Sequence, residues 1–344
     1  MLTLNVHPFQ LKLRHTFRIT HGSRDYQPTV IISLSNGIYT GYGEATATKY
    51  YGLDQDEMIH RFNAWKPIIE STPLVTAEKY WELLHPLLKN HPFEQCALDE
   101  AAHDLLAQME GLPLYKKWGL QYQNNPLTDY TLGFGPTEEM VAKMNEMPWP
   151  IYKIKLGTKD DLNIIRHLRK HTTAVFRVDA NAGWTLEQAL FKIPLLKELG
   201  VEFVEQPLAK DDWEGMKVLY EKSVLPLYAD EACVFEADVK KCYNHFHGIN
   251  IKLTKCSGIT PARNMIKEAK QLGIKVMVGC MNESSIGTAA IAQLAPMLDH
   301  VDMDGPLLLT EDIANGVHFE NGKIIYNQGY GLGIELTGQF GTDL

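Results

Sequence analysis

Eight short apolar segments recur between residues 130 and 304, and they restrict the fold more than any other feature of this 344-residue chain. Their starts lie 22 to 27 residues apart, which leaves room for one helix and its turns in each interval. In order along the chain the segments are YTLGF, YKIKL, VFRVD, EFVEQ, LPLYAD, INIKL, KVMVG and HVDMD. Short apolar runs bounded by turn residues are typical of buried strands, so we expect eight strands with helices between them.

The intervals carry helix-start signals of their own. Thr185 and Gln188 form a capping box at the start of TLEQALFKIPLLKELG, which ends at Gly200. Thr260 is expected to cap the helix in TPARNMIKEAKQLG, with Pro261 at its first position. Regular alternation of strands and helices predicts a parallel β/α barrel. The alternative is a doubly wound open sheet, which more often carries a glycine-rich first turn that this chain lacks.

The segments on either side of this repeat follow other patterns. Residues 1–46 alternate like strands and contain an Asn-Gly turn, and residues 56–118 have helical periodicity. We interpret residues 1–120 as one α+β unit. After the eighth strand, GVHFENGKIIYNQGYGLGIEL favours a hairpin around Asn321 and Gly322 over a final helix, so the tail is expected to return to the N-terminal unit.

Composition and charge argue against several classes of partner. Asp and Glu outnumber Lys and Arg by 42 to 33, a net charge of −9, which disfavours nucleic acid or an anionic membrane as the main partner. No apolar run reaches the roughly 20 residues of a membrane helix, and the N-terminal stretch lacks the apolar core of a signal peptide. The five cysteines are scattered without a C-x-x-C pair, which is typical of a reducing compartment. We therefore expect a cytoplasmic protein, and the sequence leaves open whether it forms a homo-oligomer.

Three acidic residues lie at the ends of three successive predicted strands. Asp179, Glu205 and Asp230 are 26 and 25 residues apart, which places one of them in each repeat. In a parallel barrel the carboxyl ends of the strands meet at one rim, where active sites lie. One such acid alone would most often be a solvated loop residue, but three in register repel one another. A hard divalent cation relieves that repulsion, and an all-oxygen ligand set suits Mg²⁺.

Lysines occupy two of the predicted strands in otherwise apolar surroundings. Lys153 and Lys155 alternate in PIYKIKLG and so point to the same side of the second strand. Lys252 stands in INIKLTKC on the sixth strand, which lies opposite the second in an eight-stranded barrel. Each lysine alone is most simply a half-exposed side chain with its ammonium in water. Together they place an amine on each side of a carbon atom, and burial near a cation is expected to depress their pKa values to those of general bases.

These motifs, K-x-K, D-x-N, E-Q-P, D-E, K and D-x-D in this order, resemble those of the enolase superfamily in its muconate-lactonizing subgroup. Within that subgroup the chain looks like the dipeptide epimerases, of the L-Ala-D/L-Glu epimerase type. The resemblance covers nearly the whole chain and implies an α/β fold, a modified (β/α)7β TIM barrel over residues 121–310. It also implies an α+β capping domain, formed by residues 1–120 together with a C-terminal tail, residues 311–344.

The resemblance implies a catalytic role for each lysine and each strand-end acid. The ligands of one Mg²⁺ ion per active site correspond to Asp179, Glu205 and Asp230. Lys155 and Lys252 correspond to the two bases, one on each face of the substrate's α-carbon. Lys153 corresponds to the lysine that faces the substrate carboxylate and holds the enolate charge. Lysine bases paired with Mg²⁺ are an established arrangement in this superfamily.

The same resemblance assigns contacts to the substrate. Asp302 and Asp304 match the D-x-D that receives the N-terminal ammonium, although a plain turn is the alternative interpretation of DMDGP. Two carboxylates at a fixed spacing favour a cation in a dry pocket. Thr131 belongs to the same substrate-binding group. Arg24 lies in THGSRDYQP, expected as a loop over the barrel mouth, and matches the arginine that meets a glutamate side chain.

Two further polar residues are expected behind this set. Asn181 and Glu231 follow two of the strand-end acids by one or two positions. From there they would orient the metal ligands or Lys252.

The sequence therefore predicts an isomerase, a Mg²⁺-dependent epimerase of small dipeptides with L-Ala-D/L-Glu first among its substrates. Other enolate chemistry on the same site stays open: N-acylamino acid racemisation, o-succinylbenzoate synthesis or muconate-type cycloisomerisation. So does a preference for apolar or cationic dipeptides, with Lys49 or Asp54 in TKYYGLDQD setting the choice. Two rivals are a non-catalytic metabolite-binding barrel and a pyridoxal-phosphate racemase with one Schiff-base lysine. The resemblance suggests a place in murein-peptide recycling.

Overall fold

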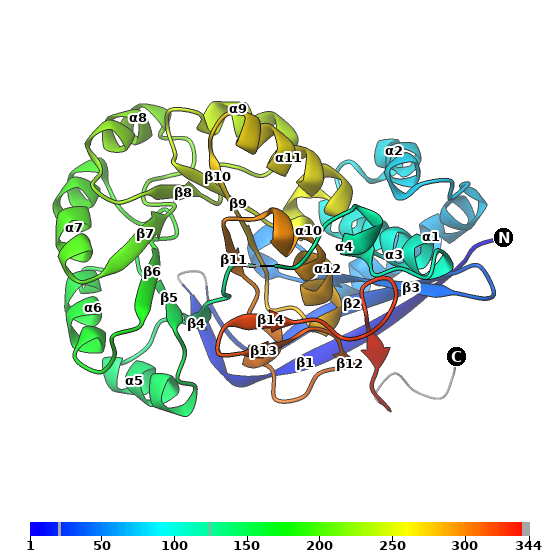
Figure 1. Ribbon diagram of the computed structural model, residues 1–344, viewed down its shortest axis with the longest axis horizontal. Helices are drawn as coiled ribbons and strands as arrows, with labels where there is room; N and C mark the ends of the chain where they lie inside the picture. Colours follow the sequence, from blue (N-terminus) through cyan, green and yellow to red (C-terminus); the bar gives the residue numbers. More distant parts are fainter. Residues whose placement is uncertain (20–21, 124, 339–344) are drawn as a thin grey trace.

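A computed structural model describes residues 1–19, 22–123 and 125–338, which form a barrel with a smaller α+β unit packed against it (Figure 1). Eight parallel strands make the barrel, in an order around the sheet that follows their order in the chain. They are β4 (Tyr130–Leu132), β5 (Ile151–Lys155), β6 (Val175–Asp179), β7 (Val201–Glu205), β8 (Leu227–Ala229), β9 (Gly248–Ile251), β10 (Lys275–Gly279) and β11 (His300–Asp302). A parallel bridge joins Thr128, two residues before β4, to Val301 of β11, which brings the two ends of the sheet together. The predicted barrel is confirmed, and the open doubly wound sheet is wrong.

Helices follow the first seven strands and cover the outside of the barrel (Figure 1). They are α5 (Thr137–Glu146), α6 (Asp161–Arg169), α7 (Leu186–Glu198), α8 (Trp213–Lys222), α9 (Glu236–Cys242), α10 (Leu253–Cys256), α11 (Ile259–Gln271), α12 (Ser285–Leu294) and the 3₁₀ turn η2 (Ala295–Met297). The capping box of α7 is confirmed, because the Thr185 hydroxyl accepts from the Gln188 N–H and the Gln188 side chain accepts from the Thr185 N–H. Apolar side chains of strands and helices bury against one another in a continuous core, which holds the strand ends in place.

The N-terminal unit is a three-stranded antiparallel sheet with helices packed on it. Its elements are β1 (Thr3–Ile19), β2 (Gly22–Ser35), β3 (Thr40–Thr46), η1 (Lys49–Tyr51), α1 (Gln55–Ser71), α2 (Ala77–Leu88), α3 (Pro92–Met109) and α4 (Leu114–Lys117). Asn36 forms the expected turn, since its side chain accepts hydrogen bonds at 2.9 Å from the N–H groups of Ile38 and Tyr39. Gly43 lets β3 approach α3 closely, because a Cβ there would lie 2.0 Å from the Ala97 carbonyl oxygen.

The start of α11 differs from the prediction that Thr260 caps it. The helix begins at Ile259 after Gly258, whose φ of +124° suits glycine. Its cap comes from a distant part of the chain. Asp99 on α3 accepts hydrogen bonds from the Thr260 backbone N–H at 2.7 Å and from the Thr260 hydroxyl at 2.8 Å. Thr260 therefore lies inside the first turn, and a carboxylate of the N-terminal unit satisfies the helix end.

The hairpin of β1 and β2 corrects the expectation of a loop over residues 20–28. Residues 20–21 lie outside the described part of the chain, but from Gly22 onward the segment is strand, and Arg24 pairs with Phe17. The hairpin extends along the barrel, where the Phe134 N–H donates to the Arg18 carbonyl at 2.9 Å (Figure 1). A strand pair, and not a loop, therefore carries Arg24 to the barrel mouth.

After β11 the chain passes through η3 (Gly305–Leu308) and returns to the N-terminal unit, as expected. The tail contains β12 (Ala314–Asn315), β13 (His318–Glu320), β14 (Lys323–Ile325) and β15 (Glu335–Leu336). β13 and β14 form the predicted hairpin, with Asn321 and Gly322 both at positive φ. The Leu332 N–H donates to Asp104 of α3 at 2.8 Å. The boundaries at residues 120 and 310 stay predictions.

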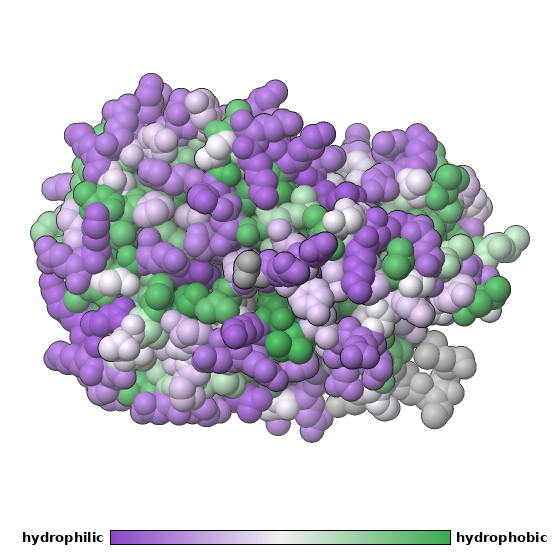
Figure 2. Space-filling view, in the orientation of Figure 1, coloured by the Kyte–Doolittle hydropathy of each residue, from purple (hydrophilic) through white to green (hydrophobic). Residues whose placement is uncertain are grey.

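Polar side chains cover most of the face seen in Figure 2, and apolar side chains lie there in small separate groups. Among the helices of residues 1–19, 22–123 and 125–338, none is both long and apolar enough to cross a bilayer.

Candidate active site

A cavity of about 100 Å³ lies where the N-terminal unit meets the carboxyl ends of the barrel strands. The barrel contributes Lys155, Asp230, Lys252, Asp302 and Asp304 to its lining, among others. The N-terminal unit contributes Phe17 and Arg24 from the hairpin and Tyr51 from η1. Ligands of α/β barrels bind at this end of the strands, so the position by itself favours an active site.

The three acids predicted as metal ligands lie together at this rim. One carboxylate oxygen from each of Asp179, Glu205 and Asp230 can be chosen so that all three lie within 4.8 Å of one another, and all three residues are buried. Asp179 and Glu205 are paired neighbours in register at the ends of β6 and β7, and Asp230 follows β8. One acid per repeat therefore converges on one point, because parallel strands all end at the same rim.

The electrostatics of this cluster fit a cation. Burial, together with Asp179, raises the pKa of Glu205 to about 7. Burial works in the same direction on Asp179 and Asp230, but neighbouring lysines hold the pKa of both below the usual range. The Glu205 Oε2 atom is buried without a hydrogen-bond partner among the described residues, although Lys153 Nζ lies 2.9 Å away. Three converging carboxylates could hold a divalent ion that prefers oxygen.

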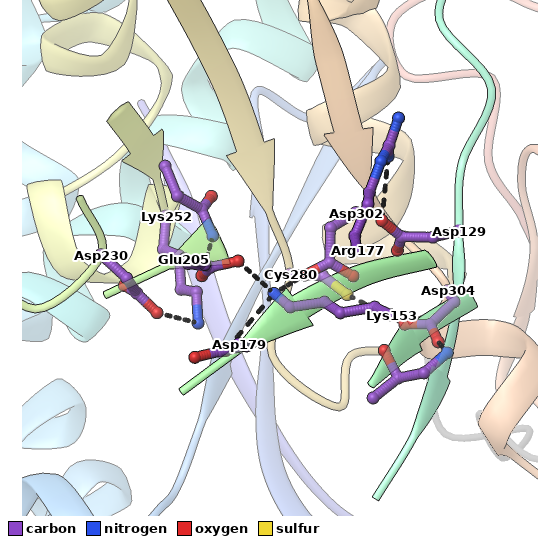
Figure 3. A network of polar contacts seen from close by, with 12 residues as sticks. Asp129, Lys153, Arg177, Asp179, Glu205, Asp230, Lys252, Cys280, Asp302 and Asp304 are labelled. Atoms are coloured by element: carbon purple, nitrogen blue, oxygen red, sulfur yellow. Dashed lines mark hydrogen bonds and ion pairs between the residues drawn. The ribbon is translucent and has the colours of Figure 1, made fainter. Parts of the chain in front are cut away.

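The three predicted lysines all contact the acid cluster, and Figure 3 shows two of them, Lys153 and Lys252. Lys155 Nζ lies 2.7 Å from Asp179 Oδ2, and Lys252 Nζ lies 3.0 Å from Asp230 Oδ2. The two lysines belong to β5 and to the end of β9, with three strands between them in each direction around the barrel. They therefore approach the cluster from opposite sides.

Lys153 lies between the metal-ligand cluster and the D-x-D motif. Its Nζ is 2.5 Å from Asp302 Oδ2 and 2.9 Å from Glu205 Oε2. The side chain is 2% exposed, so the ammonium is held by carboxylates and not by water.

For Lys153 and Lys252 in this arrangement, the expected depression of the pKa is wrong. Burial lowers the pKa of Lys153 and Lys252, but the facing carboxylates raise both well above the usual value. The reason is that the lysines themselves carry the positive charge that balances the acid cluster. A cation bound to the same carboxylates would compete with the lysines for that charge.

Asp302 and Asp304 both face the cavity, but their surroundings differ. Lys153 holds the pKa of Asp302 below its usual value despite burial. Burial and the nearby Asp302 raise the pKa of Asp304 to about 7. Asp304 accepts a hydrogen bond from the Thr131 backbone N–H at 2.6 Å, and the Cys280 thiol lies 3.7 Å from its other oxygen. Thr131 therefore contacts this acid and also lines the cavity.

Arg24 stands at the boundary between this cavity and a second, outer cavity of about 550 Å³. Its guanidinium donates to the Gln27 side chain, which is itself held by the carbonyls of Pro28 and Ala47 at 2.7 Å each. Lys49 and Asp54 lie in the outer cavity, where Asp54 also caps α1 through the N–H groups that follow it. The Arg24 guanidinium is therefore held at this boundary by Gln27. The Asp54 carboxylate already accepts hydrogen bonds as the N-cap of α1.

Asn181 and Glu231 both line the cavity, but their predicted orienting role stays a prediction. Asn181 contacts Asp179 through its backbone N–H, at 2.9 Å, and not through its side chain. Asn181 Oδ1 and Glu231 Oε2 are buried without hydrogen-bond partners among the residues described. Burial and Asp230 raise the pKa of Glu231 to about 7.

Three polar residues of the site were missed in the sequence. Asn250 donates to Glu205 Oε1 at 2.7 Å, and Lys255 contacts Asp230 from α10. Asp129 pairs with Arg177 inside the barrel at 2.9 Å. Asn250 could have been found, because it lies two residues before Lys252 and so shares its side of the strand. Lys255 follows a strand end on a short helix, and no strand periodicity indicates its direction.

Comparison with known families identifies this arrangement. Residues 1–119 match the profile described as mandelate racemase / muconate lactonizing enzyme, N-terminal domain. Residues 137–340 match the profile described as enolase C-terminal domain-like. This chain belongs to the enolase superfamily. The resemblance drawn from the K-x-K, D-x-N and D-x-D motifs is thereby confirmed.

Several superfamily members are similar to this chain over most of its length. An L-Ala-D/L-amino acid epimerase from Flavobacterium johnsoniae is 50% identical over 335 residues, covering 97% of this chain and 100% of the relative. An L-Ala-D/L-Glu epimerase from Bacteroides thetaiotaomicron is 36% identical, covering 95% and 86%. The crystal structure of a dipeptide epimerase from Cytophaga hutchinsonii, complexed with Mg and the dipeptide D-Ala-L-Val, has a TM-score of 0.92 at 26% identity and covers 98% of this chain and 96% of that chain.

Proposed function

We propose that this protein is a Mg²⁺-dependent dipeptide epimerase, an isomerase that moves a proton at the α-carbon of the substrate's C-terminal residue. The observation that carries the proposal is the pair Lys155 and Lys252, which approach one carboxylate cluster from opposite strands of the barrel. Inversion at one carbon needs a proton acceptor on one face and a proton donor on the other. The similarity to enzymes named dipeptide epimerases supports the same reaction.

The chain's own residues divide the reaction between them. For one stereoisomer, Lys155 Nζ accepts the α-proton, and Lys252 Nζ returns a proton to the opposite face; for the other stereoisomer the roles exchange. Lys153, as an ammonium, lies where it can balance the negative charge that develops on the substrate. Mg²⁺ held by Asp179, Glu205 and Asp230 would supply positive charge beside the substrate carboxylate and lower the cost of removing the α-proton.

Asp302 and Asp304 support a substrate with a free amino terminus. Both acids are buried at the cavity wall, and a free ammonium group is the complementary partner for two carboxylates. N-acylated substrates, succinylbenzoate precursors and lactones carry no such ammonium. The D-x-D therefore favours dipeptide epimerisation over the other enolate reactions.

The side-chain preference depends on the boundary between the two cavities. Arg24 lines the inner cavity, and its guanidinium is held by Gln27. A guanidinium in this position supports a substrate whose C-terminal residue is acidic, such as Glu. The outer cavity has room for a larger side chain and shares Arg24, Thr48 and Tyr50 with the inner one. We propose L-Ala-D/L-Glu as the first substrate within a wider set of L-Ala-containing dipeptides, and the relative named for D/L-amino acids supports that width.

We also propose a cytoplasmic location, which all five cysteines support by being free thiols. A homo-oligomer and a role in murein-peptide metabolism stay predictions.

The test is a dipeptide library incubated with the enzyme and Mg²⁺ in D₂O, followed by mass spectrometry and chiral separation. The proposal predicts uptake of one deuterium at the α-carbon of the C-terminal residue together with formation of the epimer. N-acetylated copies of the reactive dipeptides serve as matched controls and should exchange far more slowly. Exchange of the N-acetyl compounds at equal or higher rates would instead favour an N-acylamino acid racemase.

A further inference from the structure

The amide of Asn250 lies against one of the three converging carboxylates. Asn250 belongs to β9, is fully buried, and donates from Nδ2 to Glu205 Oε1 at 2.7 Å. Its own Oδ1 atom is buried without a hydrogen-bond partner among the described residues. Within that part of the chain, then, the side chain makes one polar contact, and that contact is to Glu205.

This contact determines how the Glu205 carboxylate is oriented. An ionised carboxylate only accepts hydrogen bonds. The Asn250 N–H therefore favours the orientation in which Glu205 Oε1 faces the amide and accepts from it. The other oxygen, Oε2, then lies 2.9 Å from Lys153 Nζ. The terminal torsion of a glutamate side chain, χ3, has only weak intrinsic preferences. Without the amide hydrogen bond, the Glu205 carboxylate would therefore rotate about this bond at a lower energetic cost.

The neighbouring strand leaves the space that the amide occupies. Gly279 ends β10, and a Cβ built there would lie 2.7 Å from Asn250 Oδ1 and 2.9 Å from Asn250 Nδ2. Contacts under 3.0 Å require something to move. All three near atoms belong to the Asn250 amide group, so a Cβ at residue 279 would displace the amide that donates to Glu205. A side chain at residue 279 would thus affect Glu205, the proposed metal ligand, through Asn250.

We infer that Asn250, seated against Gly279, is a positioning residue that holds Glu205 in the orientation required to bind the cation. The inference rests on the proposed role of Glu205 as a Mg²⁺ ligand. Groups that orient metal ligands typically affect metal affinity by about 10- to 100-fold. Neither Asn250 nor Gly279 needs to touch the substrate for this effect.

The experiment measures ion affinity directly, by Mn²⁺ electron paramagnetic resonance and by Mg²⁺ calorimetry without substrate. Asn250→Ala and Gly279→Ala should each weaken binding by about tenfold or more. In the double variant, Gly279→Ala should add less than about twofold, because the alanine at 250 leaves nothing to displace. Gly316→Ala is the matched control: its Cβ would meet the Ser285 carbonyl at 2.9 Å in the tail region, and its ion affinity should equal that of the wild type.

Kinetics give a second readout. If Asn250 acts only by orienting Glu205, saturating Mg²⁺ should restore most of kcat in Asn250→Ala. The Mg²⁺ concentration that gives half-maximal rate should stay higher than in the wild type. Unchanged ion affinity in both single variants would overturn the inference, and so would fully additive losses in the double variant. A different result would contradict the proposed metal site itself. That result is a wild type that binds no ion, or an Asp230→Asn variant that binds the ion as well as the wild type does.

Discussion

Asp99→Asn should make the protein more stable relative to the wild type as the pH rises. Asp99 is buried on α3, where it caps α11 through the backbone N–H and the hydroxyl of Thr260. Burial raises the pKa of this carboxyl from 3.8 to about 7, against the pull of those two hydrogen bonds and of one from the Ile259 backbone N–H. A raised pKa means that the folded chain keeps a proton that the unfolded chain has lost. The stability contributed by that proton is complete below about pH 4, falls as the pH rises to about 7, and is constant above.

The size of the effect follows from the same values. From about pH 5 to about pH 8 the wild type should lose about 3 kcal/mol of unfolding free energy from this one group, at about 1.4 kcal/mol for each pH unit up to 7. Asparagine does not titrate and can keep both contacts, because its carbonyl accepts from the Thr260 N–H while its amide donates to the hydroxyl oxygen. The difference between variant and wild type isolates Asp99 from the other buried acids, which both proteins share.

The assay is urea unfolding of both proteins across this pH range, followed by circular dichroism. Asp104→Asn is the matched control on the same helix, where burial raises the pKa to about 6, so its relative gain should end about one pH unit earlier. A variant that becomes less stable than the wild type as the pH rises would refute the reasoning. That result would mean that the helix end keeps Asp99 ionised in the folded protein, so that capping outweighs burial.

Two further predictions concern the site. Arg24→Ala should reduce kcat/KM for Ala-Glu by about 30-fold or more, because truncating one member of a buried charge pair costs about 2–5 kcal/mol. The same substitution should reduce kcat/KM for Ala-Met much less. Equal losses for both dipeptides, measured side by side, would remove Arg24 from side-chain selection. Asp230→Asn should abolish turnover and weaken Mg²⁺ binding while the circular dichroism spectrum is retained; full wild-type activity in excess EDTA would contradict the metal requirement altogether.

The barrel and the meeting of its acids could be predicted because they follow from local patterns. A buried parallel strand is a short apolar run, and each of the eight predicted runs overlaps an observed strand. Once the strands are known to be parallel, their ends share one rim, and Asp179, Glu205 and Asp230 must approach one another. The opposition of Lys155 and Lys252 follows from counting strands around the barrel.

The parts that could not be predicted depend on partners far away in the chain. The polar sequence around Arg24 suggested a loop, but pairing with Phe17 makes it a strand. The cap of α11 comes from Asp99, more than a hundred residues earlier, so local helix-start rules misplace it. The lysine pKa values depend on distances to several carboxylates, and neither those distances nor the resulting sign can be obtained from the alternation of residues in PIYKIKLG.

The most direct test of the central claim is to follow α-proton exchange in the two single-lysine variants, with each stereoisomer supplied separately. Lys155→Ala and Lys252→Ala, loaded with Mg²⁺ in D₂O, are given pure L-Ala-L-Glu or pure L-Ala-D-Glu, and deuterium at the glutamate α-carbon is measured by mass spectrometry. Two bases on opposite faces predict complementary results: neither variant forms the epimer, and each exchanges only the isomer whose α-proton faces the surviving lysine. Epimer formation by both variants at near wild-type rates would contradict the account, because the two lysines could not then be the acid and the base.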